Sequence, residues 1–241
     1  MRIRTTLTLP EIISRHREIV FAIILGVIMF SLFLVHEGRG PMLGGLDVAM
    51  FRAINRDMQN TVLDSLAATA SNIGSMHIYV FILLVSSLLF LSMIRRSKDL
   101  RKSAIILVIA LVFSIIIIYP LKSIFGVSRP YYYLNDVHVY CGGKWHNIIE
   151  PLSQNDKGNS FPSAHATRLF VVLGILWMYK RLRVPLLLFF LLLSFFIVYI
   201  GSHYVSDVAM GSVIGLVVGY LLQDITGKFK LNFMLFTVFN A

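Results

Sequence analysis

The sequence predicts an all-α, polytopic membrane protein, with six transmembrane helices and interfacial amphipathic helices in the first outer loop. Hydrophobic residues make up 57% of the 241 residues and charged residues only 14%, which is too little polar surface to cover a water-soluble globule. The long apolar runs do not alternate with polar residues, as strands of a membrane β-barrel would. We expect residues 1–241 to form a single integral membrane domain.

The six predicted spans are apolar runs that approach the roughly 20 residues a helix needs to cross the hydrocarbon core. They cover residues 19–35, 77–94, 103–124, 166–179, 184–202 and 208–222. The first has no small-residue cleavage site after it, so we interpret it as a retained helix. The fourth is short, but a helix from about Ser163 to Arg181 would be long enough.

Between the first two spans, residues 44–75 carry apolar side chains three or four positions apart. These are Leu46, Met50, Phe51, Ile54, Met58, Val62, Leu63, Leu66 and Ala70. The spacing predicts one or two amphipathic helices at the outer membrane interface. We favour a packing lid over the bundle rather than a substrate gate, because such spacing alone is common.

Basic residues predict the orientation of the chain. They lie before the first span, at 95–102, at 180–183 and after the last span, all on one side of a six-pass chain. Because cationic loops stay in the cytoplasm, we expect a plasma (inner) membrane protein with cytoplasmic termini and an active site facing outward. The net charge of +10 is explained mostly by these basic cytoplasmic segments, which anionic lipid headgroups attract. The sequence has no basic strip interleaved with aromatic residues, so nothing in it favours a nucleic-acid partner.

Polar residues that carry chemistry converge on the predicted outer face, within residues 122–207. Lys122 ends the third span, Ser163 and His165 begin the fourth, and His203 and Asp207 occupy the turn between the fifth and sixth. Although they are distant in sequence, the topology brings all of them to one membrane face. We therefore expect a single site there.

These residue types suit phosphoryl transfer without a metal or other cofactor. Lys122, Arg129 and the backbone amides from Ser163 to His165 can bind a phosphate and stabilise its transition state. A neutral imidazole can attack phosphorus to give a phosphohistidine, while a second protonates the departing alkoxide. Asp207 can hold the ring of His203 in the tautomer needed for attack. The single cysteine, Cys141, fits no zinc pattern.

Three motifs together resemble those of the type 2 phosphatidic acid phosphatase superfamily, over about residues 47–224. They are Lys122-x6-Arg129-Pro130, Pro162-Ser163-Ala164-His165 and His203-x3-Asp207. The resemblance implies that His203 is the nucleophile, Asp207 its orienting partner and His165 the general acid. It also implies that Lys122, Arg129 and Ser163 hold the phosphoryl oxygens. Ala164 stands where the family usually has glycine and keeps its amide available.

One departure from the family concerns a phosphate-binding arginine. Phe196 and Ile197 occupy the positions of the usual Ser-Arg pair, and one lost charge-assisted contact costs about 2 to 4 kcal/mol, or about 30- to 1000-fold in rate. Arg168, one helical turn after His165, can replace it by reaching the same anion. Alternatively, Arg168 pairs with a neighbouring acid or extends toward the interface.

The expected function is a membrane lipid phosphatase or diphosphatase. Its candidate substrates are phosphatidic acid, phosphatidylglycerophosphate and polyprenyl diphosphates such as undecaprenyl diphosphate, the last suiting an apolar pocket best. The alternatives are a lipid phosphotransferase and a weakened protein that binds lipid or phosphate. We favour an enzyme because the acid, the nucleophile and the orienting carboxylate are all present.

Gly211, Gly215 and Gly219 recur every four residues along the sixth span. Such small-residue faces allow close helix packing. A homodimer through these glycines is a possible partner interaction, but we favour packing within the bundle.

Overall fold

The computed structural model describes residues 28, 38–75, 77–152 and 159–228, so the first predicted span lies almost wholly outside the described residues. The described elements from Gly45 onward belong to one compact unit, Gly38–Ala241. In order they are α3 (Gly45–Arg52), a π-helix η1 (Ala53–Asp57), α4 (Thr61–Ser75), α5 (His77–Ile94), α6 (Lys98–Phe125), α7 (Pro130–Tyr133), β1 (Val137–Cys141), β2 (Lys144–Ile148), α8 (Ala164–Leu176), α9 (Lys180–Tyr199) and α10 (Val205–Lys228).

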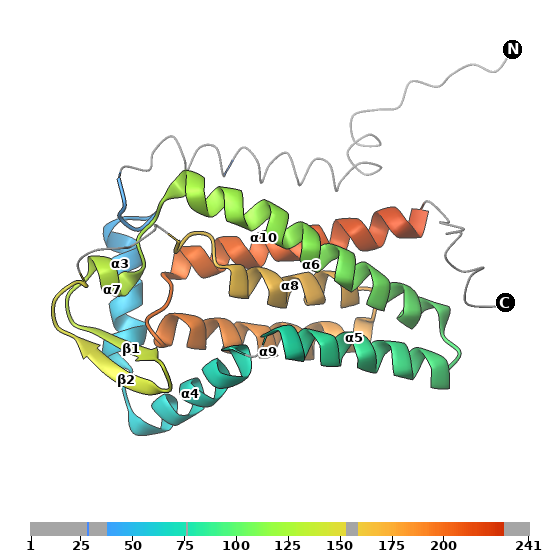
Figure 1. The fold of residues 1–241 in the computed structure, drawn as a ribbon, viewed down its shortest axis with the longest axis horizontal. Helices are drawn as coiled ribbons and strands as arrows, with labels where there is room; N and C mark the ends of the chain where they lie inside the picture. Colours follow the sequence, from blue (N-terminus) through green and yellow to red (C-terminus); the bar gives the residue numbers. More distant parts are fainter. Residues whose placement is uncertain (1–27, 29–37, 76, 153–158, 229–241) are drawn as a thin grey trace, which may run out of the picture. The chain divides into compact units, whose positions relative to one another are not determined.

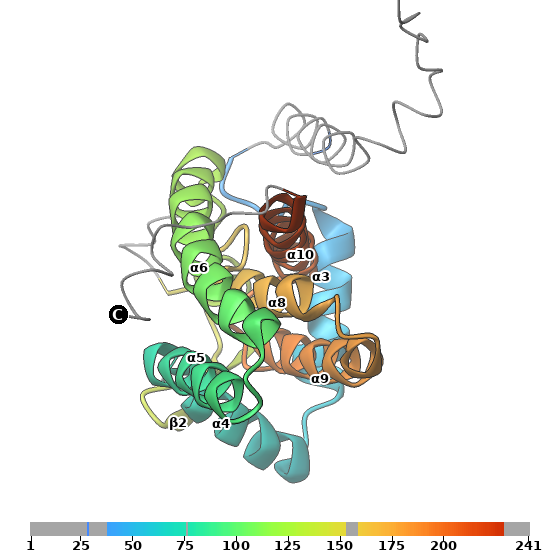
Figure 2. The same ribbon diagram turned by 90° about the vertical axis from the view of Figure 1, so that its right-hand side faces the viewer.

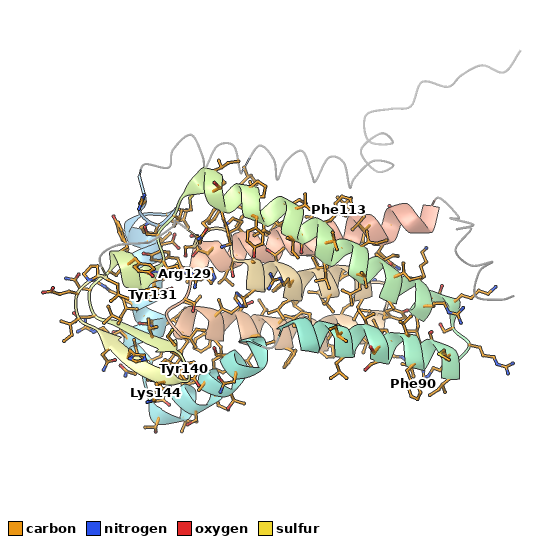
Figure 3. The ribbon with its side chains drawn as sticks, in the orientation of Figure 1. Phe90, Phe113, Arg129, Tyr131, Tyr140 and Lys144 are labelled. Atoms are coloured by element: carbon orange, nitrogen blue, oxygen red, sulfur yellow. The ribbon has the colours of Figure 1, made fainter. Side chains whose placement is uncertain are left out.

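The long helices form a bundle with α8 at its centre, flanked by α6, α9 and α10 (Figure 2). The core joins Leu107 of α6, Val171 and Leu173 of α8, and Phe190 of α9. Large apolar side chains elsewhere on α5, α6 and α9 face outward; Phe113, labelled in Figure 3, is 48% exposed. An apolar outer surface of this extent is expected where helices face lipid.

Three described helical segments are long and apolar enough to cross a membrane: Lys98–Tyr133, Lys180–Tyr199 and Val205–Asp224. They correspond to the third, fifth and sixth predicted spans, and they make the chain an integral membrane protein. The second predicted span coincides with α5, of which Ile82–Ile94 forms a shorter apolar stretch. The prediction of six spans is therefore confirmed only in part.

The predicted extension of the fourth span to Arg181 is wrong. Helix α8 ends at Leu176 after 13 residues, a length of about 20 Å against a hydrocarbon core of about 30 Å. The chain turns there because the Tyr179 amide donates to the Leu176 carbonyl and the Arg183 side chain donates to the Trp177 carbonyl. All side chains from Phe170 to Leu176 are buried, so α8 is a central helix enclosed by protein.

The two ends of the bundle differ in character (Figure 1). The α5–α6 turn, the α8–α9 turn and the carboxyl end of α10 lie at one end. Helices α3 and α7 and the strands lie at the other. The basic segments 95–102 and 180–183 therefore share one end, as predicted. Which membrane side this end faces stays a prediction.

The predicted interfacial segment forms α3, η1 and α4. Its buried residues include the polar Asp47 and Asn55 besides Phe51 and Ala67, whereas Leu46 and Val62 of the predicted apolar stripe are 59% and 66% exposed. Asn55 donates to the carbonyls of His138 and Tyr199 and accepts from the His138 amide. Polar contacts therefore help to anchor this segment, while part of its predicted apolar stripe, including Leu46 and Val62, is exposed.

A two-stranded antiparallel sheet corrects the all-α prediction. Strands β1 and β2 pair from Val137 with Ile148 to Cys141 with Lys144. Gly142 and Gly143 form the turn with φ of 60° and 79°, a left-handed conformation that glycine adopts without strain. The alternation from Val137 to Tyr140 and the paired glycines are hairpin signals present in the sequence.

The glycine face of α10 packs against α8 inside the bundle. A Cβ atom added at Gly211, Gly215 or Gly219 would lie 2.1 to 2.4 Å from a backbone carbonyl oxygen of Ser163, Thr167 or Val171. The favoured reading of this face is confirmed. A homodimer through these glycines is not supported, because α8 already occupies the surface it would need.

Candidate functional site

The predicted site residues lie where helices begin or end near the hairpin end of the bundle. Lys122 is in the last turn of α6, which stops at Gly126, a residue with φ of 61°. Arg129 is the N-cap of α7, with Pro130 at the first helical position. Figure 3 shows Arg129 at this end of the bundle, on the opposite end from Phe90. The end of α6 and the start of α7 thus place Lys122 and Arg129 at the same end of the bundle.

His203 and Asp207 form a buried pair at the start of α10. The Nδ1 atom of His203 lies 3.3 Å from Oδ2 of Asp207, and the two residues are 1% and 0% exposed. The same oxygen accepts hydrogen bonds from the Tyr204 amide at 2.9 Å and from the Ser160 hydroxyl at 2.5 Å. One oxygen of Asp207 therefore contacts the ring, the Tyr204 amide and the Ser160 hydroxyl.

The surroundings of His203 keep its ring neutral. Burial lowers the pKa of His203 well below its ordinary value, and the nearby cations Arg129 and Lys122 lower it further because each disfavours a positive ring. A neutral imidazole is the form that can act as a nucleophile.

Lys122 is only 7% exposed. Its Nζ donates to the Ser160 carbonyl at 3.1 Å and to the Asn159 carbonyl. These two residues belong to the loop that leads into α8. A buried ammonium needs such acceptors when no anion is bound. Arg129 and Arg168 both lie close enough to interact with Lys122 electrostatically.

His165 is half-buried in the first turn of α8. Its ring centroid lies 6.2 Å from that of His203, with the ring planes 62° apart. A separation of this size places both rings within reach of one tetrahedral phosphate. The structure thus brings together Lys122, Arg129, His165, His203 and Asp207, as the sequence predicts.

Ser163 caps the start of α8. It is fully buried, its hydroxyl is the N-cap of α8 and accepts from the Ala166 amide, and its own amide donates to the Asp207 carbonyl at 2.9 Å. In this structure the Ser163 amide is used within the chain, and the role of Ser163 in holding phosphate stays a prediction. The amides of Ala164 and His165 stay the predicted donors.

The positions of the missing Ser-Arg pair lie on α9. Phe196 is 7% exposed and packs with Ala67 and Tyr199, so it serves a hydrophobic cluster between α4 and α9. Ile197 is half-buried. Arg168, also half-buried on α8, interacts electrostatically with Lys122, and its role as an anion ligand stays a prediction.

Three residues that pack at the candidate site were not predicted as site residues: Ser160, Asp47 and Ser206. Ser160 donates to Asp207, and Asp47 of α3 accepts from both the amide and the hydroxyl of Ser206, at 3.0 and 2.5 Å. Asp47 and Ser160 are fully buried. Ser160 stands two residues before the Pro162 motif, which is a local signal; nothing local marks the pairing of Asp47 with Ser206.

Within the described ranges, no cluster of three His, Cys, Asp or Glu side chains could hold a metal ion. Metal-free chemistry stays a prediction.

A cavity of about 240 Å³ lies between η1 and the hairpin, and neither His165 nor His203 lines it. Its polar lining includes Arg56, Gln59, Asp136, His138 and Asn147. These groups pair with one another: His138 contacts Asn147 at 2.7 Å and Gln59 at 3.2 Å, and Arg56 lies 3.8 Å from Asp136. The cavity therefore belongs to the packing of the hairpin against η1 and the residues that follow it.

Comparisons with known proteins give one family match and two solved structures with a similar fold. A family model described as the PAP2 superfamily matches residues 103–230. The crystal structure of Aquifex aeolicus LpxE is similar with a TM-score of 0.56 and 23% identity, covering 75% of this chain and 96% of that one. A transmembrane PAP2-type phosphatidylglycerolphosphate phosphatase from Bacillus subtilis gives a TM-score of 0.62 and 17% identity, with coverages of 86% and 96%. No curated protein sequence matches the chain.

Proposed function

Because the chain belongs to the PAP2 superfamily, we propose that it is a membrane lipid phosphatase that hydrolyses a lipid phosphate monoester or diphosphate. The observation that carries this proposal is the buried His203–Asp207 pair, at 3.3 Å, with the His165 ring 6.2 Å from that of His203. Two imidazoles around one anion position suit a reaction in which one attacks phosphorus and the other transfers a proton.

In the first proposed step, Nε2 of His203 attacks phosphorus. Asp207 accepts the hydrogen bond of Nδ1–H, which leaves the lone pair on Nε2. A P–N bond forms, the P–O bond to the lipid breaks, and His165 gives a proton to the leaving oxygen. A dephosphorylated lipid, or a lipid monophosphate from a diphosphate, then leaves.

In the second step, water attacks the phosphohistidine. His165, now neutral, accepts a proton from the water as a new P–O bond forms and the P–N bond breaks. Inorganic phosphate leaves, and both histidines return to their starting protonation states. The two steps conserve protons without a further reactant.

The gathered cations stabilise charge on the phosphoryl oxygens. Lys122 and Arg129 are the predicted phosphate ligands, and we include Arg168 as the replacement for the arginine missing at Ile197. The proximity of Arg168 to Lys122 supports this assignment. Lys122 exchanges its contacts with the two loop carbonyls for phosphate when substrate binds.

The substrate class is defined by the phosphate and by an apolar tail. The B. subtilis neighbour is named a phosphatidylglycerolphosphate phosphatase, which supports testing that lipid. Phosphatidic acid and undecaprenyl diphosphate complete the candidates, since each couples an anionic head to a long hydrocarbon chain.

The test is phosphate release from these three lipids by the purified protein in detergent, with and without a metal chelator. We expect release with at least one lipid, unchanged by chelator. His203→Ala and His165→Ala should each lose at least about 100-fold in kcat. The matched control is His146→Ala, which changes an exposed histidine of β2 and should keep wild-type activity.

Each element of the proposal has its own contrary result. Full activity of His203→Ala would overturn the phosphohistidine mechanism. Loss of activity in chelator, restored by a divalent metal, would overturn metal-free chemistry. Absence of phosphate release from all three lipids by a folded protein would overturn the phosphatase assignment.

A further inference from the structure

Ser160 connects the parts of the site that are expected to bind phosphate with those that are expected to attack it. It is fully buried and lies in the loop before α8. Its hydroxyl donates to Oδ2 of Asp207 at 2.5 Å and lies 3.5 Å from Nδ1 of His203. Its carbonyl accepts from Lys122 at 3.1 Å, and its amide donates to the Val127 carbonyl at 2.9 Å.

We infer that Ser160 is a positioning residue that holds the Asp207 carboxylate in the orientation that keeps His203 protonated on Nδ1. This inference rests on the proposed function, because it assigns Ser160 a part in preparing the nucleophile.

The hydrogen bonds of Asp207 show why its orientation needs Ser160. Oδ2 receives the Tyr204 amide, the Ser160 hydroxyl and the His203 ring. Oδ1 is buried and has no hydrogen-bond partner within the described part of the chain. The carboxylate is therefore oriented through one oxygen only. Without the Ser160 hydroxyl, Oδ2 keeps two partners, the Tyr204 amide and the His203 ring. The ring cannot orient the carboxylate independently, because the carboxylate is what orients the ring.

The tautomer of His203 follows from that orientation. When Oδ2 faces Nδ1, the proton is favoured on Nδ1 and the lone pair on Nε2. A carboxylate free to rotate no longer selects this tautomer, so a smaller fraction of the enzyme is ready for attack. Binding of the lipid depends on Lys122 and Arg129 and changes less.

Three variants test this inference. Ser160→Ala removes the donor, Ser160→Thr restores a hydroxyl, and Ser194→Ala is a matched control at a buried serine of α9 whose hydroxyl has no hydrogen-bond partner in the described region. We expect Ser160→Ala to lower kcat by about 10- to 100-fold with KM changed less than about threefold. Ser160→Thr should recover part of the loss, and Ser194→Ala should match the wild type.

A second measurement reads the ring directly. In protein labelled with ¹⁵N-histidine, with His203 assigned by loss of its signals in His203→Gln, the nitrogen shifts report the tautomer. We expect the Nδ1–H form in the wild type and in Ser194→Ala, and a mixture in Ser160→Ala. The spectra of the other histidines show whether each variant is folded.

The outcomes separate this inference from the proposed function. An unchanged tautomer and an unchanged kcat in Ser160→Ala would overturn the role of Ser160, as would a rise in KM alone. A shifted tautomer in a protein that hydrolyses none of the lipids would sustain the positioning role and overturn the phosphatase assignment.

Discussion

At the scale of single residues, the neutral state of His203 has a consequence for stability. Its pKa in the folded protein lies below the value of about 6.5 expected in the unfolded chain, so the unfolded chain binds a proton more readily. The contribution of the neutral ring to stability is therefore complete above about pH 6.5. It is lost as the pH falls from there toward the lower pKa of the folded protein.

We predict that acid lowers the melting temperature of the wild type more than that of His203→Gln, whose side chain does not titrate. The measurement is thermal unfolding in detergent at about pH 7.5 and at about pH 5. Equal decreases in the two proteins would mean that His203 keeps an ordinary pKa.

Arg168 gives a second prediction at the residue scale. If it supplies the cation missing at Ile197, Arg168→Ala should lower kcat/KM by about 30- to 1000-fold. Introducing Ile197→Arg into that variant should restore activity in part. Arg56→Ala removes an exposed arginine paired with Asp136 at 3.8 Å and serves as the control. Wild-type kcat/KM in a folded Arg168→Ala protein would show that its guanidinium does not reach the phosphate.

At the scale of elements, α3 holds the turn that carries His203. Asp47 of α3 accepts two hydrogen bonds from Ser206, and Phe51 contacts Tyr204 edge to face, with ring centroids 5.7 Å apart. Tyr204 and Ser206 lie between His203 and Asp207 in the sequence. The segment that contains α3 therefore packs directly on the turn that carries His203, and its role as a lid stays a prediction.

The close approach of α8 and α10 leads to a prediction about packing. A methyl group at Gly215 would lie 2.1 Å from the Thr167 carbonyl oxygen, whereas one at Gly45 of α3 would meet nothing within 4 Å. Gly215→Ala should therefore destabilise the protein by about 1 to 3 kcal/mol, while Gly45→Ala should be neutral or slightly stabilising. The measurement is thermal unfolding of both variants in detergent. Equal melting temperatures would show that the helices separate at little cost.

At the scale of the whole molecule, the native cysteine can report the orientation. Cys141 is free and exposed in the hairpin, at the end of the bundle opposite the basic turns. We predict that a membrane-impermeant maleimide labels Cys141 in intact cells that express the protein. In a Cys141→Ser background, Lys180→Cys, at the exposed start of α9, should react only after permeabilisation. The reverse pattern would place the candidate site on the cytoplasmic side.

Much of the fold could be predicted because it depends on properties that are local in the sequence. Apolar runs of sufficient length predicted α5, α6, α9 and α10, and basic segments predicted which turns share an end of the bundle. The fourth span is shorter than predicted, because a hydrophobic run does not distinguish a lipid-facing helix from a short one enclosed by protein. Long apolar runs do not predict the hairpin, because each of its strands has only five residues.

The candidate site divides in the same way. The sequence by itself determined which side chains gather at the candidate site, since the order and spacing of Lys122, His165 and His203 at helix ends place them on one face. Only the tertiary structure decided that the Ser163 amide donates to the Asp207 carbonyl, that the Ser160 hydroxyl donates to the Asp207 carboxylate, and that α8 packs on the glycines of α10. The physical reason is that these contacts join segments more than 40 residues apart. Hydrogen-bond geometry and close packing between such segments exist only once the helices have come together.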